Sequence, residues 1–443
     1  MALRLTPPDP LAMADFKLAE AMARLDALTD WERRPRNRMR VGLEPARDLA
    51  ERLGHPERTF RAVHVAGTKG KGSVSALIEA ALAGAGVSVG RYGSPHVERV
   101  TERVSLQGND VKEATLAGGL TRSLDAFEAA RRAGTAAADA TWFDLLTLAA
   151  FVIFREAALE WAVVEVGLGG RLDSTNIVDG EIAVVTNIGL EHTEILGSTR
   201  AAIAAEKAGV FKPGAVVATT LAPDDEAGRV VYARAEALGC RIVRSDAGPD
   251  ATIEETNAAL ASAVLDALGG IGVTTPSGAP ASHALLDAGA RARARLVGRM
   301  ERFTIDAGGR ALPVVLDGAH VPFNIAAVLR DLARDPVLGG RCVAVVALAR
   351  DKDAANFLAE LGRRAARIVC TNVPSTTRGR PAAELVAVAT SLGLDAEAEP
   401  DPKRAFRRGA ALASEAGAWL IVTGSLYLVG DLRGEALERA GRG

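Results

Sequence analysis

The sequence predicts an α/β protein with two domains, and three observations support this fold class. Short apolar runs rich in valine and isoleucine alternate with longer alanine- and leucine-rich stretches of helical periodicity. The short runs are apolar almost throughout, which is typical of parallel strands covered by helices on both faces. The chain of 443 residues also exceeds the size that one hydrophobic core usually supports.

The expected strands, in chain order, are AVHVAG, WAVVEVG, IAVVTNI, AVVATT, PVVLDGA, CVAVVAL, RIVCTNV and WLIVTGS. Between them, stretches such as SVSALIEAALAGAG and FDLLTLAAFVIFREA are expected to form helices. The loop-rich stretch GGIGVTTPSGAPASHA (269–284), followed by one more helix, leads to a domain boundary. A second series of strands and helices then begins at about residue 300.

The composition excludes some classes of protein. Lys and Arg number 53 against 55 Asp and Glu, a formal net charge of −2, whereas nucleic-acid binders usually carry a marked basic surplus. The basic cluster RRPRNRMR (33–40) is either a solvated surface segment or an anion-binding site. Three well-separated cysteines, Cys240, Cys342 and Cys370, are typical of a reducing compartment. No apolar run approaches the roughly 20 residues of a membrane span, so we expect a cytoplasmic protein that binds neither nucleic acid nor membrane.

The stretch HVAGTKGKGS (64–73) has the composition and context of a phosphate-binding loop. It lies between a predicted strand and a predicted helix, where backbone N–H groups and the helix dipole would converge on an anion. Its spacing departs from the usual G-x-x-x-x-G-K-[ST] pattern, because Gly72 separates Lys71 from Ser73. Lys71 could contact the β- and γ-phosphates, and Ser73 a Mg²⁺ ion. The alternative is an ordinary glycine-rich turn.

Polar residues in two other predicted strands point to a ligand or metal site. Glu165 lies inside the apolar run WAVVEVG, where a carboxylate is costly unless it is paired or binds a metal. The alternative for Glu165 is a salt bridge to an arginine. Asn187 and His192 follow the strand IAVVTNI at its C-terminal end, the edge where ligands bind in parallel sheets. For His192 alone, a structural role is the alternative.

These motifs occur together in one known family. The loop fits the pattern G-T-[NK]-G-K-G-[ST] of the folylpolyglutamate synthase/dihydrofolate synthase family, in the Mur ligase superfamily of ATP-dependent amide-bond-forming enzymes. The sequence resembles this family over nearly the whole chain, although the first 60 residues and about 215–295 contribute little. The other matching stretches, in order, are YGSPHV, TERVSLQG, TWFDLLTLAAF, EVGLGGRLDSTN, TNIGLEHTEILG, AEKAGVFKPG, LDGAH, DKD and VTGSLYLVGDLR.

The resemblance implies a P-loop ATPase domain with a mostly parallel sheet over residues 1–297. A smaller, Rossmann-like α/β domain of the glutamate ligase type would follow over residues 298–443. It implies that the ATP phosphates are held by Gly67, Thr68, Lys69, Gly70, Lys71, Gly72 and Ser73. One Mg²⁺ would be held by Ser73, Ser94 and Glu165. His192, with Glu165, would help to hold a second.

The resemblance also implies a catalytic set, which comprises Lys71, Glu165, His192 and Lys207. Lys207 matches a lysine that this superfamily can carbamylate. The alternative is an unmodified lysine paired with Glu206 or with phosphate.

Further positions are matched to the nucleotide and to the acceptor. Asn257 resembles an adenine-side contact and Arg299 a phosphate contact at the domain hinge. Asp317 resembles a ribose contact, and His320 would lie close to the nucleotide. The positions that resemble contacts on the pterin side are Thr141, Phe143 and Asp173.

The predicted activity is ATP-dependent addition of L-glutamate to a folate or pteroate acceptor through an acyl phosphate, by an enzyme expected to be a monomer. Three departures from the family concern the acceptor or the nucleotide: Val321 in DGAHVPFN, Asp144 where glutamate is common, and an N-terminal segment that keeps only part of the usual pattern. A ligase for another pterin-like acid or for a UDP-muramoyl acid is one alternative. A catalytically inactive nucleotide-binding partner protein is another.

Overall fold

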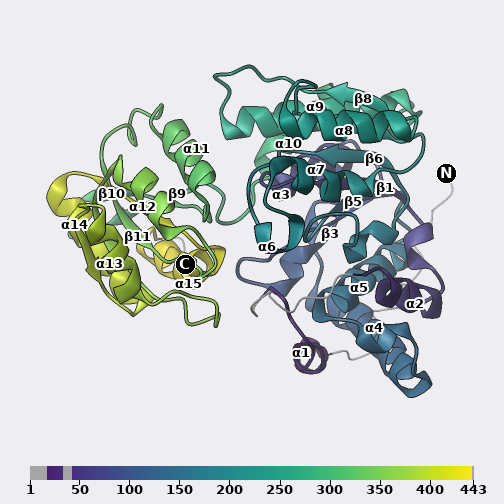
Figure 1. Cartoon of the computed structure of the whole chain (residues 1–443), viewed down its shortest axis with the longest axis horizontal. Helices are drawn as coiled ribbons and strands as arrows, with labels where there is room; N and C mark the ends of the chain where they lie inside the picture. The colour runs from purple at the N-terminus through teal and green to yellow at the C-terminus, as the bar shows by residue number, and fades with distance from the viewer. Residues whose placement is uncertain (1–16, 33–41, 442–443) are drawn as a thin grey trace, which may run out of the picture. The chain divides into compact units, whose positions relative to one another are not determined.

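The computed structural model describes residues 17–32 and 42–441. The basic cluster at 33–40 therefore lies outside the described residues. The chain divides into two compact units, the first ending at Arg295 and the second beginning at Leu296. Each unit is built on its own sheet (Figure 1).

The first unit contains an eight-stranded sheet. Its strands, in spatial order, are β4 (Asn109–Asp110), β3 (Val104–Leu106), β2 (Val89–Tyr92), β5 (Trp161–Glu165), β1 (Arg61–Ala66), β6 (Gly180–Val185), β7 (Val216–Thr219) and β8 (Arg241–Arg244). From β2 to β8 all neighbours pair in parallel, whereas β3 and β4 form an antiparallel extension at one edge. The mostly parallel sheet is the one that the sequence predicts.

Helices cover both faces of this sheet (Figure 1). They are α1 (Leu18–Asp26), α2 (Glu44–Arg52), α3 (Lys71–Gly84), α4 (Glu113–Ala133), α5 (Trp142–Glu156), α6 (Thr193–Leu196), α7 (Arg200–Lys207), α8 (Glu226–Ala237), α9 (Ile253–Gly270) and α10 (Ala288–Arg293). Short 3₁₀ turns are η2 (Pro56–Arg58), η3 (Val100–Arg103), η4 (Ala136–Asp139), η5 (Ser174–Ile177), η6 (Ala208–Val210) and η7 (His283–Leu285). The strand β5 is buried along its whole length, because α3 packs on one face and α5 on the other.

The second unit contains a six-stranded sheet. Its strands, in spatial order, are β13 (Ala396–Ala398), β12 (Ala365–Cys370), β11 (Cys342–Val346), β14 (Trp419–Thr423), β10 (Ala311–Leu316) and β9 (Glu301–Asp306). All pairs are parallel except that of β9 with β10. Its helices are α11 (Pro322–Leu332), α12 (Ala354–Gly362), α13 (Ala382–Ser391), α14 (Pro402–Ala416) and α15 (Leu426–Arg439).

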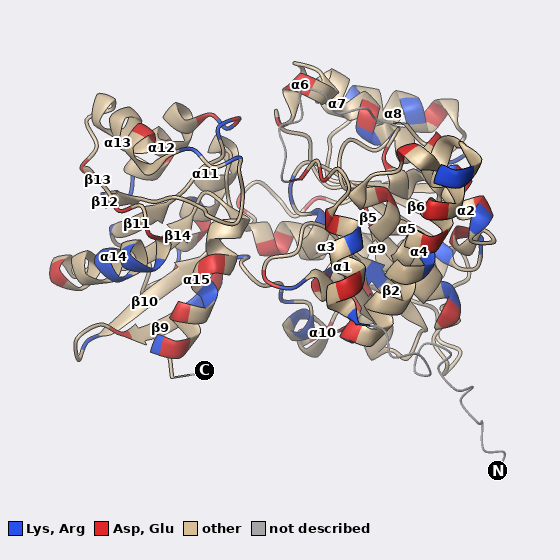
Figure 2. Ribbon diagram, turned by 90° about the horizontal axis from the view of Figure 1, so that it is seen from below, with Lys and Arg blue, Asp and Glu red and all other residues tan. Residues whose placement is uncertain are grey.

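Acidic and basic residues are mixed on the helices rather than segregated, as the red and blue segments of α15 illustrate in Figure 2. This agrees with the formal net charge of −2. Within the described ranges, no helix is both long and apolar enough to cross a membrane.

Candidate active site

The phosphate-binding loop occupies the turn from β1 to α3. Two of its glycines have backbone conformations that favour glycine, with φ of 144° at Gly67 and 85° at Gly70. A Cβ atom at Gly67 would lie 1.9 Å from Oγ1 of Thr186, and one at Gly70 would lie 2.7 Å from Oδ1 of Asn257. Only glycine therefore fits at these positions. The helix α3 begins directly at Lys71, so its first N–H groups face the loop.

The segment after β6 holds this loop in place through hydrogen bonds. The Thr68 N–H donates to the Asn187 carbonyl (2.8 Å), and the Lys69 N–H donates to Oδ1 of Asn187 (3.0 Å). In return, Nδ2 of Asn187 and Oγ1 of Thr186 donate to the Lys69 carbonyl, at 2.9 and 2.6 Å. The loop is thus ordered by the protein itself, which reduces the entropy lost when an anion binds.

Glu165 ends β5 beside the phosphate-binding loop. Its Oε1 lies 3.9 Å from Nζ of Lys71, and its Oε2 accepts a hydrogen bond from the Ser94 N–H at 3.2 Å. The side chain is buried. The lysine of the loop is therefore a cationic neighbour of Glu165. This position also brings Ser94 to the end of β5, as the motif comparison requires.

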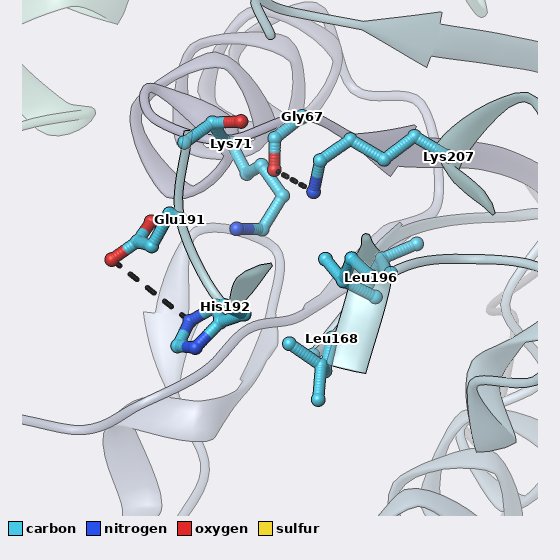
Figure 3. Close-up of a pocket in the computed structure, with 11 residues that line it drawn as sticks. Gly67, Lys71, Leu168, Glu191, His192, Leu196 and Lys207 are labelled. Carbon is cyan, nitrogen blue, oxygen red and sulfur yellow. Dashed lines mark hydrogen bonds and ion pairs between the residues drawn. The ribbon is translucent and has the colours of Figure 1, made fainter. Parts of the chain in front are cut away.

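A pocket opens beside these residues. Figure 3 shows the Lys71 amino group pointing into the space between Glu191 and His192 on one side and Leu168 and Leu196 on the other. The complete lining is Gly67, Thr68, Lys71, Val166, Gly167, Leu168, Gly169, Glu191, His192, Leu196 and Lys207. Polar groups converge here on a partly apolar wall, which is the usual construction of a small-molecule site.

The side chain of Lys207, the last residue of α7, also contacts the phosphate-binding loop. Its Nζ donates to the Gly67 carbonyl at 2.9 Å (Figure 3). Burial, together with the nearby Lys71 cation, lowers the pKa of Lys207 to about 7. A substantial fraction of the amine is therefore neutral and nucleophilic at neutral pH. This is the state that a carbamylation reaction requires.

His192 lies in the turn that begins α6, with a left-handed backbone (φ 55°). Its Nε2 lies 3.9 Å from Oε1 of Glu191, and its Nδ1 lies 3.9 Å from Oε1 of Glu194. Glu191 is itself buried and accepts from Nζ of Lys69 at 2.9 Å. The charge of Lys69 is therefore satisfied by a protein carboxylate, and Glu191 joins the loop to the histidine segment.

The residues expected to hold Mg²⁺, Ser73, Ser94 and Glu165, supply oxygen donors. Across residues 17–32 and 42–441, no group of three or more His, Cys, Asp or Glu side chains is arranged to hold a metal ion. The oxygen donors of Ser73, Ser94 and Glu165 fit Mg²⁺ nonetheless, because this ion commonly takes one or two carboxylates plus waters and phosphate oxygens. They do not fit a zinc site, which needs nitrogen or sulfur ligands.

Two of the three positions matched to the pterin side, Phe143 and Asp173, contact the glycine loop, which we define as residues 167–170. Thr141 lies at the start of α5. A Cβ at Gly167 would lie 2.5 Å from the Phe143 ring, so this ring packs directly on the loop. Oδ2 of Asp173 accepts from the Leu168 N–H at 2.8 Å. Thr141 caps α5 in a reciprocal arrangement with Asp144, donating to Oδ2 of Asp144 at 2.7 Å. Asp144 thus retains the capping function of an acidic residue at this position.

The remaining candidates belong to the separate units as follows. Asn257 of α9 packs on Gly70 in the first unit. In the second unit, Asp317 follows β10 and accepts from the N–H groups of Met300 (2.9 Å) and Ala319 (2.8 Å). Nδ1 of His320 lies 2.8 Å from the Gly318 carbonyl. A Cβ at Gly318 would lie 3.1 Å from a terminal nitrogen of Arg299. Arg299, Asp317 and His320 therefore gather at the carboxyl end of β10.

Sequence reasoning missed Thr186 and Glu191. Thr186 follows the last residue of β6 and faces the phosphate-binding loop. Its position beside Asn187, at the end of a predicted strand, is the sequence feature that would have identified it as a candidate site residue. Glu191 gave no signal of its own, because its role depends on Lys69, which is far away in the chain.

Two family models match the chain. The Mur ligase middle domain matches residues 65–267, and the glutamate ligase domain of Mur ligases matches residues 298–426. Among individual proteins, the dihydrofolate synthase/folylpolyglutamate synthase of Escherichia coli (strain K12) is 37% identical over 340 residues, 72% of this chain and 75% of the relative. The enzyme of the same description from Mycobacterium tuberculosis is 30% identical over 469 residues, 91% of both chains.

Solved structures agree with these matches. A Mycobacterium tuberculosis folylpolyglutamate synthase complexed with ADP superposes with a TM-score of 0.81 at 25% identity, covering 94% of this chain and 98% of that one. Escherichia coli FolC in complex with DHPP and ADP gives a TM-score of 0.78 at 29% identity, covering 98% and 100%. The chain belongs to the dihydrofolate synthase/folylpolyglutamate synthase family, within the Mur ligases.

Proposed function

We propose that this protein is an ATP-dependent ligase that adds L-glutamate to a folate or pteroate acceptor, with release of ADP and phosphate. The observation that carries the proposal is the preformed loop at residues 67–73, in which Gly67 and Gly70 leave no room for a side chain and Lys71 points into the pocket. Relatives of the family have been solved with AMPPNP, Mn and L-glutamate bound, which supports a nucleotide, a divalent metal and glutamate as ligands here.

The reaction needs ATP because a carboxylate and an ammonium group do not form an amide spontaneously in water. Transfer of the γ-phosphoryl group to the acceptor carboxylate gives an acyl phosphate and ADP. The deprotonated glutamate amine then attacks the acyl carbon and expels phosphate. The protein's contribution to such a transfer is positioning and charge stabilisation.

In this scheme Lys71 and the first N–H groups of α3 bind the phosphates and stabilise the charge of the transferring group. Ser73, Ser94 and Glu165 would hold Mg²⁺, which when bound neutralises phosphate charge. His192 would help to hold a second ion. Asn257 would contact the adenine side, and the expected contributions of the second unit come from Arg299, Asp317 and His320.

The acceptor is assigned to the side of the pocket formed by the glycine loop. Phe143 and Asp173 contact that loop, and Thr141 donates to Asp144 at the start of α5. The enzyme is proposed to act as a monomer. Lys207 is proposed to be carbamylated in the working enzyme, which would place a negative group next to the metal. Electron density at Lys207 from crystals grown with bicarbonate would test the modification.

The experiment that tests the function is ADP release with and without L-glutamate against a panel of acceptors. The panel comprises dihydropteroate, tetrahydrofolate, a folylpolyglutamate and a UDP-muramoyl acid. We expect glutamate-dependent turnover with at least one pterin acid and none with the UDP-muramoyl acid. Absence of glutamate-dependent turnover with every pterin acid would refute the proposal.

A further inference from the structure

A buried histidine outside the pocket is connected to the glycine loop. His64 lies in β1, the strand that leads into the phosphate-binding loop, and its side chain is fully buried. Its Nε2 lies 2.9 Å from Oγ1 of Thr175 in η5. That hydroxyl in turn donates to Oδ1 of Asp173 at 2.5 Å, and Oδ2 of Asp173 accepts from the Leu168 N–H at 2.8 Å. We call this chain of contacts the relay.

The direction of the hydrogen bonds follows from the groups involved. The Thr175 hydroxyl has one proton, and the carboxylate of Asp173 can only accept it. The hydroxyl must therefore accept from His64, which places the histidine proton on Nε2. Nδ1 of His64 has no hydrogen-bond partner in the structure. Burial lowers the pKa of His64 to about 3, so the ring stays neutral and its Nε2–H remains a donor.

The segment around Thr175 shows that this arrangement is specific. Asp173 also accepts from the Thr175 N–H at 3.1 Å, so the carboxylate is held from two sides. The neighbouring Ser174 hydroxyl donates to Asp144 at the start of α5. Nδ2 of Asn176 donates to the carbonyls of Arg171 and Gly209, at 3.0 and 3.1 Å. Each polar side chain from residue 173 to 176 thus ties the segment to a different part of the unit.

We propose that His64 and Thr175 are positioning residues for the ligation reaction: through Asp173 they hold the glycine loop in the form that borders the pocket. The loop is the part of the pocket wall opposite Glu191 and His192, and Figure 3 shows the Leu168 side chain there. The Phe143 ring packs on the same loop at Gly167. Loosening the relay therefore moves the wall on which the acceptor lies, while the phosphate-binding loop keeps its own bonds to Thr186 and Asn187. This inference rests on the proposed function.

Pairs of variants at Thr175 and His64 distinguish the loss of a relay hydrogen bond from a general loss of packing. Thr175→Val removes the hydroxyl at nearly constant shape, whereas Thr175→Ser keeps it. His64→Leu removes the donor, whereas His64→Gln keeps an amide N–H near the same place. We expect kcat/KM for the acceptor to fall about tenfold or more in the Val and Leu variants, with an ATP KM within about twofold of wild type. The Ser and Gln variants should stay near wild type.

A second measurement does not depend on turnover. Hydrogen–deuterium exchange at the Leu168 amide should accelerate in Thr175→Val relative to Thr175→Ser, because this amide donates to Asp173. Unchanged exchange at this amide, or an activity loss that only follows the folded fraction at constant acceptor KM, would overturn the inference. If wild-type enzyme turns over no pterin acid while the exchange difference is present, the proposed function fails and the relay's hold on the loop stands.

Discussion

Among the single residues of the site, three lysines next to the phosphate-binding loop have different surroundings. Lys71 points into the pocket, 3.9 Å from Glu165. Lys69 is paired with Glu191 at 2.9 Å. Lys207 is buried against the Gly67 carbonyl, where its cation is disfavoured. The three amines therefore have different tasks, although all of them lie next to one loop.

Lys71→Ala should lower kcat by about 10²–10³-fold, because it removes a charge aimed at the transferring phosphoryl group. The Lys71 side chain lines the pocket and is 16% exposed, so the variant should fold, which the circular dichroism spectrum checks, although Glu165 loses a cationic neighbour. Turnover near the wild-type rate in a folded Lys71→Ala variant would show that the loop does not bind the phosphates in the proposed way.

Lys69 and Glu191 are expected to depend on one another. Lys69→Asn leaves a buried carboxylate without its cation, a change that typically costs several kcal/mol. It should raise the ATP KM about tenfold in the Glu191 background and much less in the Glu191→Gln background. A double-mutant cycle on the ATP KM measures this coupling. Additive effects would instead indicate that Lys69 acts directly on the phosphates.

The lowered pKa of Lys207 predicts a pH dependence of stability. Between about pH 7 and the unfolded pKa of 10.5, the unfolded chain holds a proton on Lys207 that the folded chain has lost. Stability therefore rises with pH in this window, and the cost of burying the cation is fully present below pH 7. Relative to Lys207→Met, wild type should gain on the order of 2 kcal/mol between pH 7 and 9.

Urea unfolding at a series of pH values, in buffers free of bicarbonate, measures this difference and avoids carbamylation. A constant difference between wild type and Lys207→Met across the range would contradict the assigned pKa. Repeating the series with added bicarbonate should raise the stability of wild type relative to Lys207→Met if the folded amine is modified.

At the scale of elements, the parallel strands and the loops at their carboxyl ends build the site. The loop after β1 binds to the segment after β6, and Glu165 ends β5 on the other side of β1. The phosphate-binding loop tolerates no Cβ at Gly67, where φ is 144° and a Cβ would lie 1.9 Å from Oγ1 of Thr186. The fold therefore supplies the site through a few close backbone approaches.

Gly67→Ala should abolish nucleotide binding, because either the loop or the segment at Thr186 must move. Gly434→Ala in α15 is the matched control, since a Cβ there meets nothing within 4 Å. Helix propensity favours alanine by up to about 1 kcal/mol, so the control should bind nucleotide normally and unfold at a slightly higher temperature. Isothermal titration with ADP checks both variants, and wild-type affinity in Gly67→Ala would contradict the steric argument.

The sequence predicts most of the buried strands and fewer of the edge strands. The expected strands also omit β2, which is buried inside the first sheet. The valine-rich strands β1, β5, β6 and β11 are recognisable because both faces are covered. The edge strands β8 and β9 were not predicted, since β8 carries arginines at both ends and β9 alternates exposed and buried residues. Within the site, the turn from β1 to α3 is local in sequence, and its glycine-rich pattern predicts a phosphate-binding loop. The pairing of Lys69 with Glu191 and the relay from His64 depend on tertiary contacts, which no local pattern reveals.

At the scale of the whole molecule, each unit carries part of the expected machinery. The first holds the phosphate-binding loop, the pocket and the positions matched to the acceptor. The second matches the glutamate ligase domain and gathers Arg299, Asp317 and His320 at the end of β10. We expect residues of both units to activate a pterin carboxylate as an acyl phosphate. The acyl group is then transferred to the amine of glutamate.

The most direct test of this claim follows oxygen atoms. Dihydropteroate, or whichever pterin acid is turned over, is labelled with ¹⁸O in its carboxylate and incubated with ATP and L-glutamate. If the carboxylate is activated as an acyl phosphate, one ¹⁸O appears in the released phosphate for each amide formed, because the acceptor oxygen bridges to phosphorus in that intermediate. Amide formation with unlabelled phosphate would contradict this activation.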